Sequence, residues 1–299
     1  VRNKEWDGTW DWQHFLQKTI QWAAPPQPAA APGRPTAAPG EEGAAHRPAE
    51  APGPGAAADK GRSEASFLLR EDFSKGMDNW WVEGGQRVWI QDGRLHVQAD
   101  PPQGRPGQVC TVWCRQEFRG DLRVEFDCHV MESRTEANNI NFFLLYSDPA
   151  GKPLRDTRDS RADAAYDKYH NLNGYIFTFL NDREGEGGRH PDGTAKARFR
   201  IRRCPGFTLL AETFAGRCLR GTTYRVAIVR AGTLLSIAVD GKVCLEARDE
   251  RPHESGLIGL RTFQTHLWFD NLEVTRVEPP ASRDPEKRAQ EVIYGKAYR

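Results

Sequence analysis

Apolar and polar residues alternate with a period of two over most of the chain after residue 66. Two stretches place an Asp-Gly pair between alternating runs: residues 87–100 are RVWIQDGRLHVQAD, and residues 234–247 are LLSIAVDGKVCLEA. An Asp-Gly pair flanked in this way indicates a β-hairpin with a type I′ turn. These two hairpins are the firmest local predictions from the sequence.

Further short strands are predicted between Gly, Pro and Asp residues, and no helical pattern occurs after residue 66. They occupy residues 109–118, 121–131, 140–147, 173–181, 196–204, 208–214, 223–230, 256–262 and 267–274. About a dozen short strands without helices predict an all-β fold. We therefore expect an antiparallel two-sheet sandwich of the jelly-roll type.

The remainder of the chain has other patterns. Residues 1–24 carry apolar side chains at helical spacing and are expected to be the helical end of a preceding domain, similar to the closing helix of amidotransferase-like or trehalose-utilisation-type domains. Between residues 25 and 58, 26 of 34 residues are Pro, Ala or Gly, so residues 25–66 are predicted to be a disordered linker. Residues 279–299 are a charged tail. The sandwich is thus expected at residues 67–278, which is long enough for one sizeable core.

Charge and hydropathy exclude several classes of protein. The chain has 42 Lys and Arg against 41 Asp and Glu, a formal net charge of +1, which argues against a dedicated nucleic-acid binder. No apolar run is long enough for a membrane span. The first 24 residues lack the order of a signal peptide. Since the chain opens with Val1, an export signal is expected upstream, and the expected location is periplasmic or extracellular.

Three segments carry a resemblance to known proteins. They are EDFSKGMDNWWVEGG, the stretch YHNLNGYIFTFLNDREGE with the later ARFRIRRCPGFTLLAE, and the ending SGLIGLRTFQTHLWFDNLEV. Together they resemble the concanavalin A-like lectin/glucanase superfamily and, more narrowly, the YesU-like bacterial domains of unknown function and the related 3-keto-disaccharide hydrolase domains. The resemblance implies the sandwich fold and a poly- or oligosaccharide partner, and it leaves the reaction open.

The strand at residues 121–131 is the first candidate for catalysis. Glu125, Asp127 and His129 share one of its faces, with roughly 6.6 Å between successive members. Sandwich glucanases place two Glu and one Asp on such a face, because two carboxylates must flank the glycosidic bond. Here His129 takes the third position, so the motif is broken. In a hydrolase Glu125 and Asp127 would act, and the alternative is a solvated strand face.

The strand at residues 196–204 is the second candidate, because it turns a row of cations to one face. Lys196, Arg198, Arg200 and Arg202 alternate with apolar residues, and like charges in a row repel unless an acidic strand or an anionic ligand offsets them. A uronate would fit, since the Arg fork suits a carboxylate. Pairing with carboxylates of neighbouring strands is the alternative.

A polysaccharide lyase also needs a residue that removes the proton next to the uronate carboxylate. Tyr169 and His170 are the candidates for this base and its partner acid, because they lie in a loop that leads into the strand at residues 173–181, where scaffolds often present functional side chains. In this version Arg198 or Arg200 holds the carboxylate. Ordinary packing of the loop is the alternative for Tyr169 and His170.

Other polar and aromatic side chains are candidates for binding the sugar. Amide and hydroxyl groups suit sugar hydroxyls, and an indole can stack on a sugar ring, although a strand Trp is more often part of the core. The turn near residues 261–266 carries polar residues that the resemblance places near the sugar-binding face. The predicted substrate-binding residues are Asn141, Asn173, Tyr175, Arg198, Arg200, Arg261, His266 and Trp113.

No cofactor is expected apart from a structural calcium ion. The resemblance pairs the acid of the FDN ending, Asp270, with an acid near the first strand, either Glu71 or Asp72, and oxygen ligands suit calcium. Simple hydrogen bonding is the alternative. The six cysteines lack a zinc-site spacing. Cys204 and Cys218 flank loops and would be able to form a disulfide in an exported protein.

Two functions follow from these patterns. The first is a glycoside hydrolase or polysaccharide lyase that acts on a saccharide, including uronate-containing ones. The second is a non-catalytic carbohydrate-binding module tethered by the linker to an upstream domain, which would raise its effective concentration near the substrate. The size of the sandwich and the long insertion before residue 170 favour the enzyme, and the linker favours the module.

Overall fold

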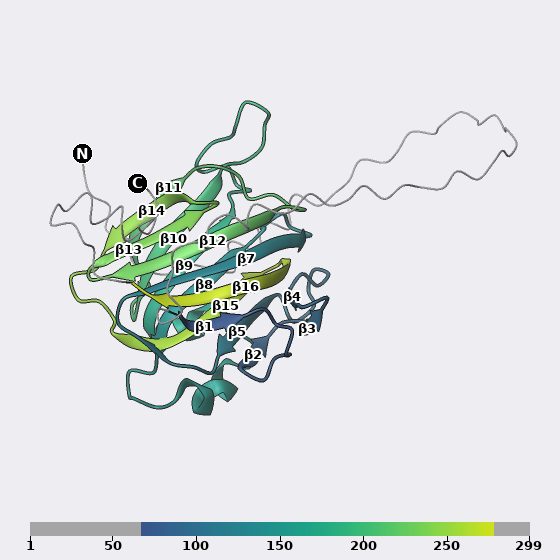
Figure 1. The fold of residues 1–299 in the computed structure, drawn as a ribbon. Coiled ribbons are helices and arrows are strands. Elements are labelled where there is room, and N and C mark those ends of the chain that lie inside the picture. Colours follow the sequence, from purple (N-terminus) through teal and green to yellow (C-terminus); the bar gives the residue numbers. More distant parts are fainter. Residues whose placement is uncertain (1–66, 278–299) are drawn as a thin grey trace, which may run out of the picture. The chain divides into compact units, whose positions relative to one another are not determined.

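A computed structural model of the chain describes residues 67–277, which form a sandwich of two antiparallel eight-stranded sheets (Figure 1). The predicted fold class is confirmed. The predictions for residues 1–66 and for the charged tail lie outside the described residues. No helix within residues 67–277 has the length and apolar character needed to cross a bilayer.

In sheet A the last strand of the fold, β16, is an inner strand beside the central β7. Its order is β14 (Lys242–Arg248), β13 (Leu234–Val239), β12 (Thr223–Ala231), β7 (Leu122–Glu132), β16 (His266–Arg276), β4 (Arg94–Gln98) and β3 (Arg87–Gln91), and β1 (Phe67–Glu71) also pairs with β16.

Sheet B contains the strands from which most of the predicted sugar-binding residues come. Its order is β11 (Thr208–Phe214), β10 (Ala197–Cys204), β9 (Asn173–Asn181), β8 (Ile140–Ser147), β15 (Ser255–Phe263), β5 (Val109–Cys114) and β2 (Trp80–Gly84), and the short β6 (Phe118–Arg119) also pairs with β15.

Both predicted hairpins form. In the β3–β4 turn Asp92 and Gly93 have φ values of 52° and 70°, and in the β13–β14 turn Asp240 and Gly241 have 50° and 77°. Positive φ at both central residues is the requirement of a type I′ turn. Each of the other nine predicted stretches also contains a strand.

The main core lies between the sheets and follows from the alternation along each strand. Strand β7 shows this most plainly, because every second residue from Leu122 to Val130 is buried while the polar residues between them are half-buried on the outer face. Phe126 of β7 stacks on Phe142 of sheet B, with ring centroids 5.5 Å apart, and meets the edge of Phe269. The two sheets are therefore joined by interdigitating aromatic and aliphatic side chains.

A second, smaller core lies on the opposite face of sheet B. The connection between β8 and β9, residues 148–172, contains two 3-10 helices, η3 (Leu154–Arg161) and η4 (Tyr166–Tyr169). We call residues 148–172 the cover segment. Its buried residues pack on Trp81, Trp113 and Phe143 of sheet B. The sequence predicted no helix here, and these 3-10 turns are too short to give a helical period.

The cysteines are not cross-linked. All six lie within residues 67–277 and are free thiols, so the disulfide considered between Cys204 and Cys218 is absent. The Tyr146 hydroxyl donates to the Cys204 sulfur at 3.6 Å, and the Cys218 thiol donates to the carbonyl of Asn138 at 3.0 Å. Both thiols thus pack as buried polar groups of the sandwich.

Candidate functional site: a polar row on the outer face of sheet B

One polar residue from each of seven neighbouring strands lies in a single line across the outer face of sheet B. Consecutive members of this line are register partners. Strands in a sheet are about 4.8 Å apart, so six spacings extend roughly 29 Å. We call this line the polar row; its members are Glu83, Thr111, Arg261, Asn141, Thr178, Arg200 and Glu212.

A mostly apolar row runs beside the polar row and lies under the cover segment. Trp81, Trp113, Gly259, Phe143 and Ile176 are successive register partners. A Cβ at Gly259 would lie 2.8 Å from the Trp113 ring, so glycine is needed where the indole crosses this strand. The apolar row fixes the cover segment over one side of the polar row.

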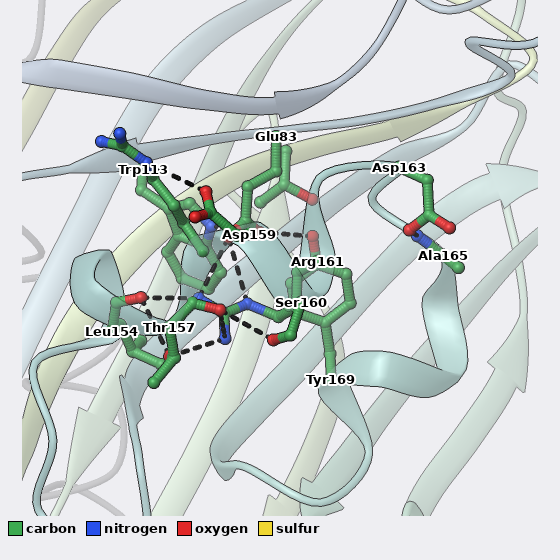
Figure 2. Close-up of polar contacts among 12 residues, drawn as sticks. Glu83, Trp113, Leu154, Thr157, Asp159, Ser160, Arg161, Asp163, Ala165 and Tyr169 are labelled. Atoms are coloured by element: carbon green, nitrogen blue, oxygen red, sulfur yellow. Dashed lines mark hydrogen bonds and ion pairs between the residues drawn. The ribbon is translucent and has the colours of Figure 1, made fainter.

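Glu83 anchors the cover segment to the sheet through a buried network (Figure 2). Its carboxylate lies 3.0 Å from the Arg161 guanidinium and accepts hydrogen bonds from the Tyr169 hydroxyl at 2.6 Å and the Trp113 indole at 3.0 Å. Arg161 also donates to the carbonyl of Leu154 at 2.7 Å. Burial raises the pKa of Tyr169 far above its usual value, so its hydroxyl keeps its proton.

Arg261 forms a second anchor in the polar row. It is 1% exposed and donates to the Thr111 hydroxyl at 2.7 Å and to the carbonyl of Ala164 in the cover segment at 3.0 Å. Its guanidinium lies 4.9 Å from the ring centres of both Tyr166 and Tyr169. Within residues 67–277 it makes no ion pair, and its Nε has no hydrogen-bond partner. The cation is held by rings and neutral oxygens alone.

The centre of the polar row is buried and incompletely hydrogen-bonded. Asn141 and Thr178, on neighbouring strands β8 and β9, are 6% and 4% exposed although they lie on the outer face. The Asn141 Oδ1 has no partner among the described residues. A buried polar group without a partner costs about 1–3 kcal/mol. The centre of the row therefore holds a buried acceptor that no described residue satisfies.

The far end of the polar row is an ion-pair cluster. Arg198 and Arg200 of β10 both donate to one oxygen of Glu212, at 2.7 and 2.5 Å, and Arg198 also lies 2.7 Å from Glu186. Burial opposes ionisation of Glu212, but the hydrogen bonds from the two arginines lower its pKa below the usual value. Pairing with an adjacent acidic strand therefore offsets these two cations.

Arg202 differs from its neighbours on β10. Its guanidinium stacks 4.2 Å from the Phe207 ring centre and donates to the Phe207 carbonyl at 3.2 Å. His170 stacks on the same ring, with centroids 3.7 Å apart. Burial lowers the pKa of His170 to about 4; Asp167 opposes the shift, and Arg261 and Arg202 add to it. The imidazole is therefore neutral at pH 7.

Comparison with known proteins places the chain in a family. Residues 106–272, more than half of the chain, match the family described as "Domain of unknown function (DUF6250)". The chain belongs to this family. No curated protein matches it. The family description names no activity, so the site has to be interpreted from its geometry.

Solved structures share the fold of this DUF6250 domain. A protein of unknown function with a galectin-like fold from Bacillus subtilis is 19% identical with a TM-score of 0.58, covering 71% of this chain and 96% of that one. The exoplasmic/lumenal domain of VIP36, in its Ca2+/Man3GlcNAc-bound form, is 11% identical with a TM-score of 0.50, covering 78% and 96%. The expected two-sheet sandwich of the concanavalin A-like type is confirmed as a fold, whereas the narrower YesU-like and 3-keto-disaccharide hydrolase resemblances stay predictions.

The predicted hydrolase pair lies on the other side of the DUF6250 domain. Glu125 and Asp127 are on the outer face of sheet A, where Glu125 pairs with Arg123 at 2.7 Å and Asp127 pairs with Arg225 at 3.3 Å. Asn271 also donates to Asp127 at 2.7 Å. The hydrolase and lyase hypotheses thus use opposite faces of the sandwich.

The predicted sugar-binding residues are also divided among faces. Trp113, Asn141, Arg198, Arg200 and Arg261 lie on the outer face of sheet B, as described above. Of these five, Asn141, Arg200 and Arg261 belong to the polar row, and the remaining three predicted residues lie elsewhere. Tyr175 faces the core and donates to Asp249 at 2.6 Å; Asn173 donates to Ser147 at 3.3 Å; and His266 lies on the outer face of sheet A, 3.2 Å from His96.

The two predicted calcium ligands contact other groups of the protein, and a structural calcium ion stays a prediction. Asp72 accepts hydrogen bonds from the backbone and hydroxyl of Ser74. Asp270 lies 3.9 Å from Arg94 and accepts from the backbone of Asn271. A guanidinium beside the carboxylate opposes a bound cation, and residues 67–277 contain no group of three or more His, Cys, Asp or Glu suited to a metal. Hydrogen bonding, the alternative reading, describes both acids.

Sequence reasoning missed Glu83, Arg161, Thr111 and Thr178. Thr111 and Thr178 alternate with buried residues of their strands, which is a visible signal, but their alignment depends on register across sheet B. Glu83 lies on β2, which was not singled out as a strand, and Arg161 lies within the long insertion. Their pairing joins residues 78 positions apart, and no local pattern indicates it.

Proposed function

We propose that this DUF6250 domain binds a poly- or oligosaccharide along the polar row of sheet B. The observation that carries the proposal is the buried centre of the row, where the Asn141 amide oxygen lacks a partner beside the Thr178 hydroxyl. An amide both donates and accepts, and a hydroxyl does the same. The Asn141 oxygen is buried in this structure, so a saccharide has to displace the side chains that cover it. A sugar hydroxyl is then the matching group, because it can donate to Asn141 while accepting from its surroundings.

The surroundings of this centre also suit a saccharide. Half-buried Tyr166 of the cover segment lies 4.9 Å from the Arg261 guanidinium, and aromatic rings present apolar faces to sugar rings. The fold is shared with the VIP36 domain in its Man3GlcNAc-bound form. That likeness concerns the fold, and the residues of the row supply the argument for this chain.

Binding is favoured over catalysis by the state of the predicted catalytic groups. The Tyr169 hydroxyl is buried and hydrogen-bonded to Glu83, so it is not available to remove a proton from a substrate. Glu125 and Asp127 are engaged in ion pairs on the far face. The domain therefore acts as a carbohydrate-binding module, and a location outside the cytoplasm and an enzymatic domain in the same parent protein are part of the proposal.

A glycan-binding panel on the whole chain tests this function. Thr178→Val keeps the shape of the side chain and removes its hydroxyl, and Asn141→Ala removes the amide. Each is expected to weaken saccharide binding about tenfold, the effect of losing one or two hydrogen bonds. Thr275→Val, at a buried threonine of sheet A, is the matched control and should bind as the unchanged protein does.

The same panel distinguishes the enzymatic alternatives. Reducing-sugar release without an unsaturated product would indicate hydrolysis, and ultraviolet absorbance from an unsaturated uronate would indicate elimination. Either result would contradict the assignment as a binding module. Failure to bind any glycan, or equal loss of binding in Thr178→Val and Thr275→Val, would refute the site.

A further inference from the structure

Positive charge exceeds negative charge around the polar row. Glu83 is neutralised by Arg161, and Glu212 together with Glu186 accounts for Arg198 and Arg200. Arg202 and Arg261 remain, and neither makes an ion pair within residues 67–277. The outer face of sheet B therefore holds two cations, Arg202 and Arg261, that no carboxylate of the described residues approaches within ion-pair distance.

These two cations act on the same part of the surface. Both influence the titration of Tyr166 and of His170, which belong to the cover segment. Burial lowers the pKa of Arg202, with Arg200 and Arg198 adding to the shift against the opposing effects of Tyr166 and Glu212. Partly buried, mutually repelling cations are costly unless an anion is near.

Of these two cations, Arg202 is the one placed to touch a ligand. Arg261 is 1% exposed and is engaged with Thr111 and Ala164. Arg202 is half-buried and, among the described residues, makes one hydrogen bond, to the carbonyl of Phe207. Stacking on the Phe207 ring fixes the plane of the Arg202 guanidinium. Since only one hydrogen bond is made, the other N–H groups of this guanidinium remain for an acceptor. A planar, oriented fork of donors is the partner that a carboxylate prefers.

We infer that the saccharide bound along the polar row is acidic, and that Arg202 holds the carboxylate of a uronic acid unit while buried Arg261 adds a positive field beneath it. The inference rests on the proposed function and adds the class of ligand. Arg202 is two residues from Arg200 on β10, roughly 6.6 Å along the strand. If a uronate carboxylate binds Arg202, the hydroxyl groups of the same saccharide lie beside Thr178 and Asn141.

Calorimetric binding of oligogalacturonate, mannuronate oligomers and glucuronate-bearing xylo-oligosaccharides to the whole chain tests the inference. Each acidic probe is compared with its own carboxyl-reduced form, which has the same linkage and length. At least one acidic probe should bind about tenfold more tightly than its reduced form, since a charge-assisted hydrogen bond is lost. Its affinity should also fall as salt is raised, while that of the reduced form should not.

Substitution of Arg202 assigns the effect to this residue. Arg202→Met should remove the preference for the acidic probe and leave binding of the reduced form within about twofold. Arg202→Lys, which keeps the charge and loses the fork, should retain part of the preference. Arg225→Met is the control, because it removes one half-buried cation from the outer face of sheet A; it should keep the full preference. Thermal unfolding checks that each variant is folded.

The outcomes separate the inference from the proposed function. Equal binding of acidic and reduced forms would overturn the acidic class while leaving saccharide binding in place. A preference that survives in Arg202→Met, or that is lost equally in Arg225→Met, would overturn the role of Arg202. Tighter binding of sulfated than of uronate oligosaccharides would also overturn it, because the ligand group would be a sulfate. Binding of no saccharide would refute the proposed function itself.

Discussion

Replacing Arg161 by Met should release the cover segment from sheet B. The side chains of Arg161 and Glu83 are 3% and 1% exposed, and their closest atoms are 3.0 Å apart. Removing one partner of such a pair leaves an uncompensated buried charge, which costs about 3–5 kcal/mol. That is a large share of the about 5–15 kcal/mol by which a domain of this kind is stable. Arg161→Met should therefore unfold at a much lower urea concentration.

Two companion variants make this result interpretable. Arg158→Met lies in the same 3-10 helix, but Arg158 is 52% exposed and its partner Asp159 is 97% exposed, so the change should be below about 0.5 kcal/mol. Combining Arg161→Met with Glu83→Gln removes both charges and should recover part of the loss. Urea unfolding followed by tryptophan fluorescence measures all three. A loss below about 1 kcal/mol in Arg161→Met would refute the reasoning that this pair anchors the cover segment.

Three further outcomes are expected. Tyr169→Phe removes a hydrogen bond to a buried carboxylate and should cost about 1.5–3 kcal/mol in urea unfolding, without changing turnover in any activity that the glycan panel reveals. Burial lowers the pKa of His96 to about 4 and also lowers the pKa of His266. The neutral imidazoles therefore stabilise the fold above about pH 6.5, and this stabilisation is lost as the pH falls towards 4. His96→Gln combined with His266→Gln should therefore lose less stability between pH 7 and pH 4 than the unchanged chain. An identical pH dependence would contradict this. Gly259→Ala should lower the melting temperature through overpacking against Trp113, at a cost of about 1–3 kcal/mol, and an unchanged melting temperature would show that the indole can move.

The fold was predictable because its signals are local. The alternation in β7 separates core from outer residues without any knowledge of its neighbours, and two Asp-Gly pairs supply the positive φ values that their hairpins need. The bounds of β1, β2 and β6 were harder to predict from the sequence, since each of these strands is short. The cover segment gave no periodic signal, because its order comes from packing on Trp113 and from the buried Glu83–Arg161 pair.

The site was only partly predictable, because it depends on register and on which sheet a strand joins. Asn141, Arg200 and Arg261 were chosen for their chemistry, and the structure aligns them in one row. Arg261 and His266, five residues apart, were grouped by sequence and lie on opposite outer faces, since β15 and β16 belong to different sheets. The arginines of β10 also differ in a way that spacing hides: two share Glu212, whereas Arg202 has no carboxylate partner among the described residues.

The cover segment leaves sheet B at the end of β8 and re-enters it at the start of β9, and these two strands are neighbours. Its contribution to the site is therefore a single continuous insertion between adjacent attachment points, with the sandwich complete on either side. Such an arrangement lends itself to grafting: exchanging residues 148–172 for another insertion would alter Tyr166 and His170, while the strand order and the polar row stay as they are. Ligand preference and scaffold stability can then be engineered as separate traits, provided that a graft retains partners for both Glu83 and Arg261.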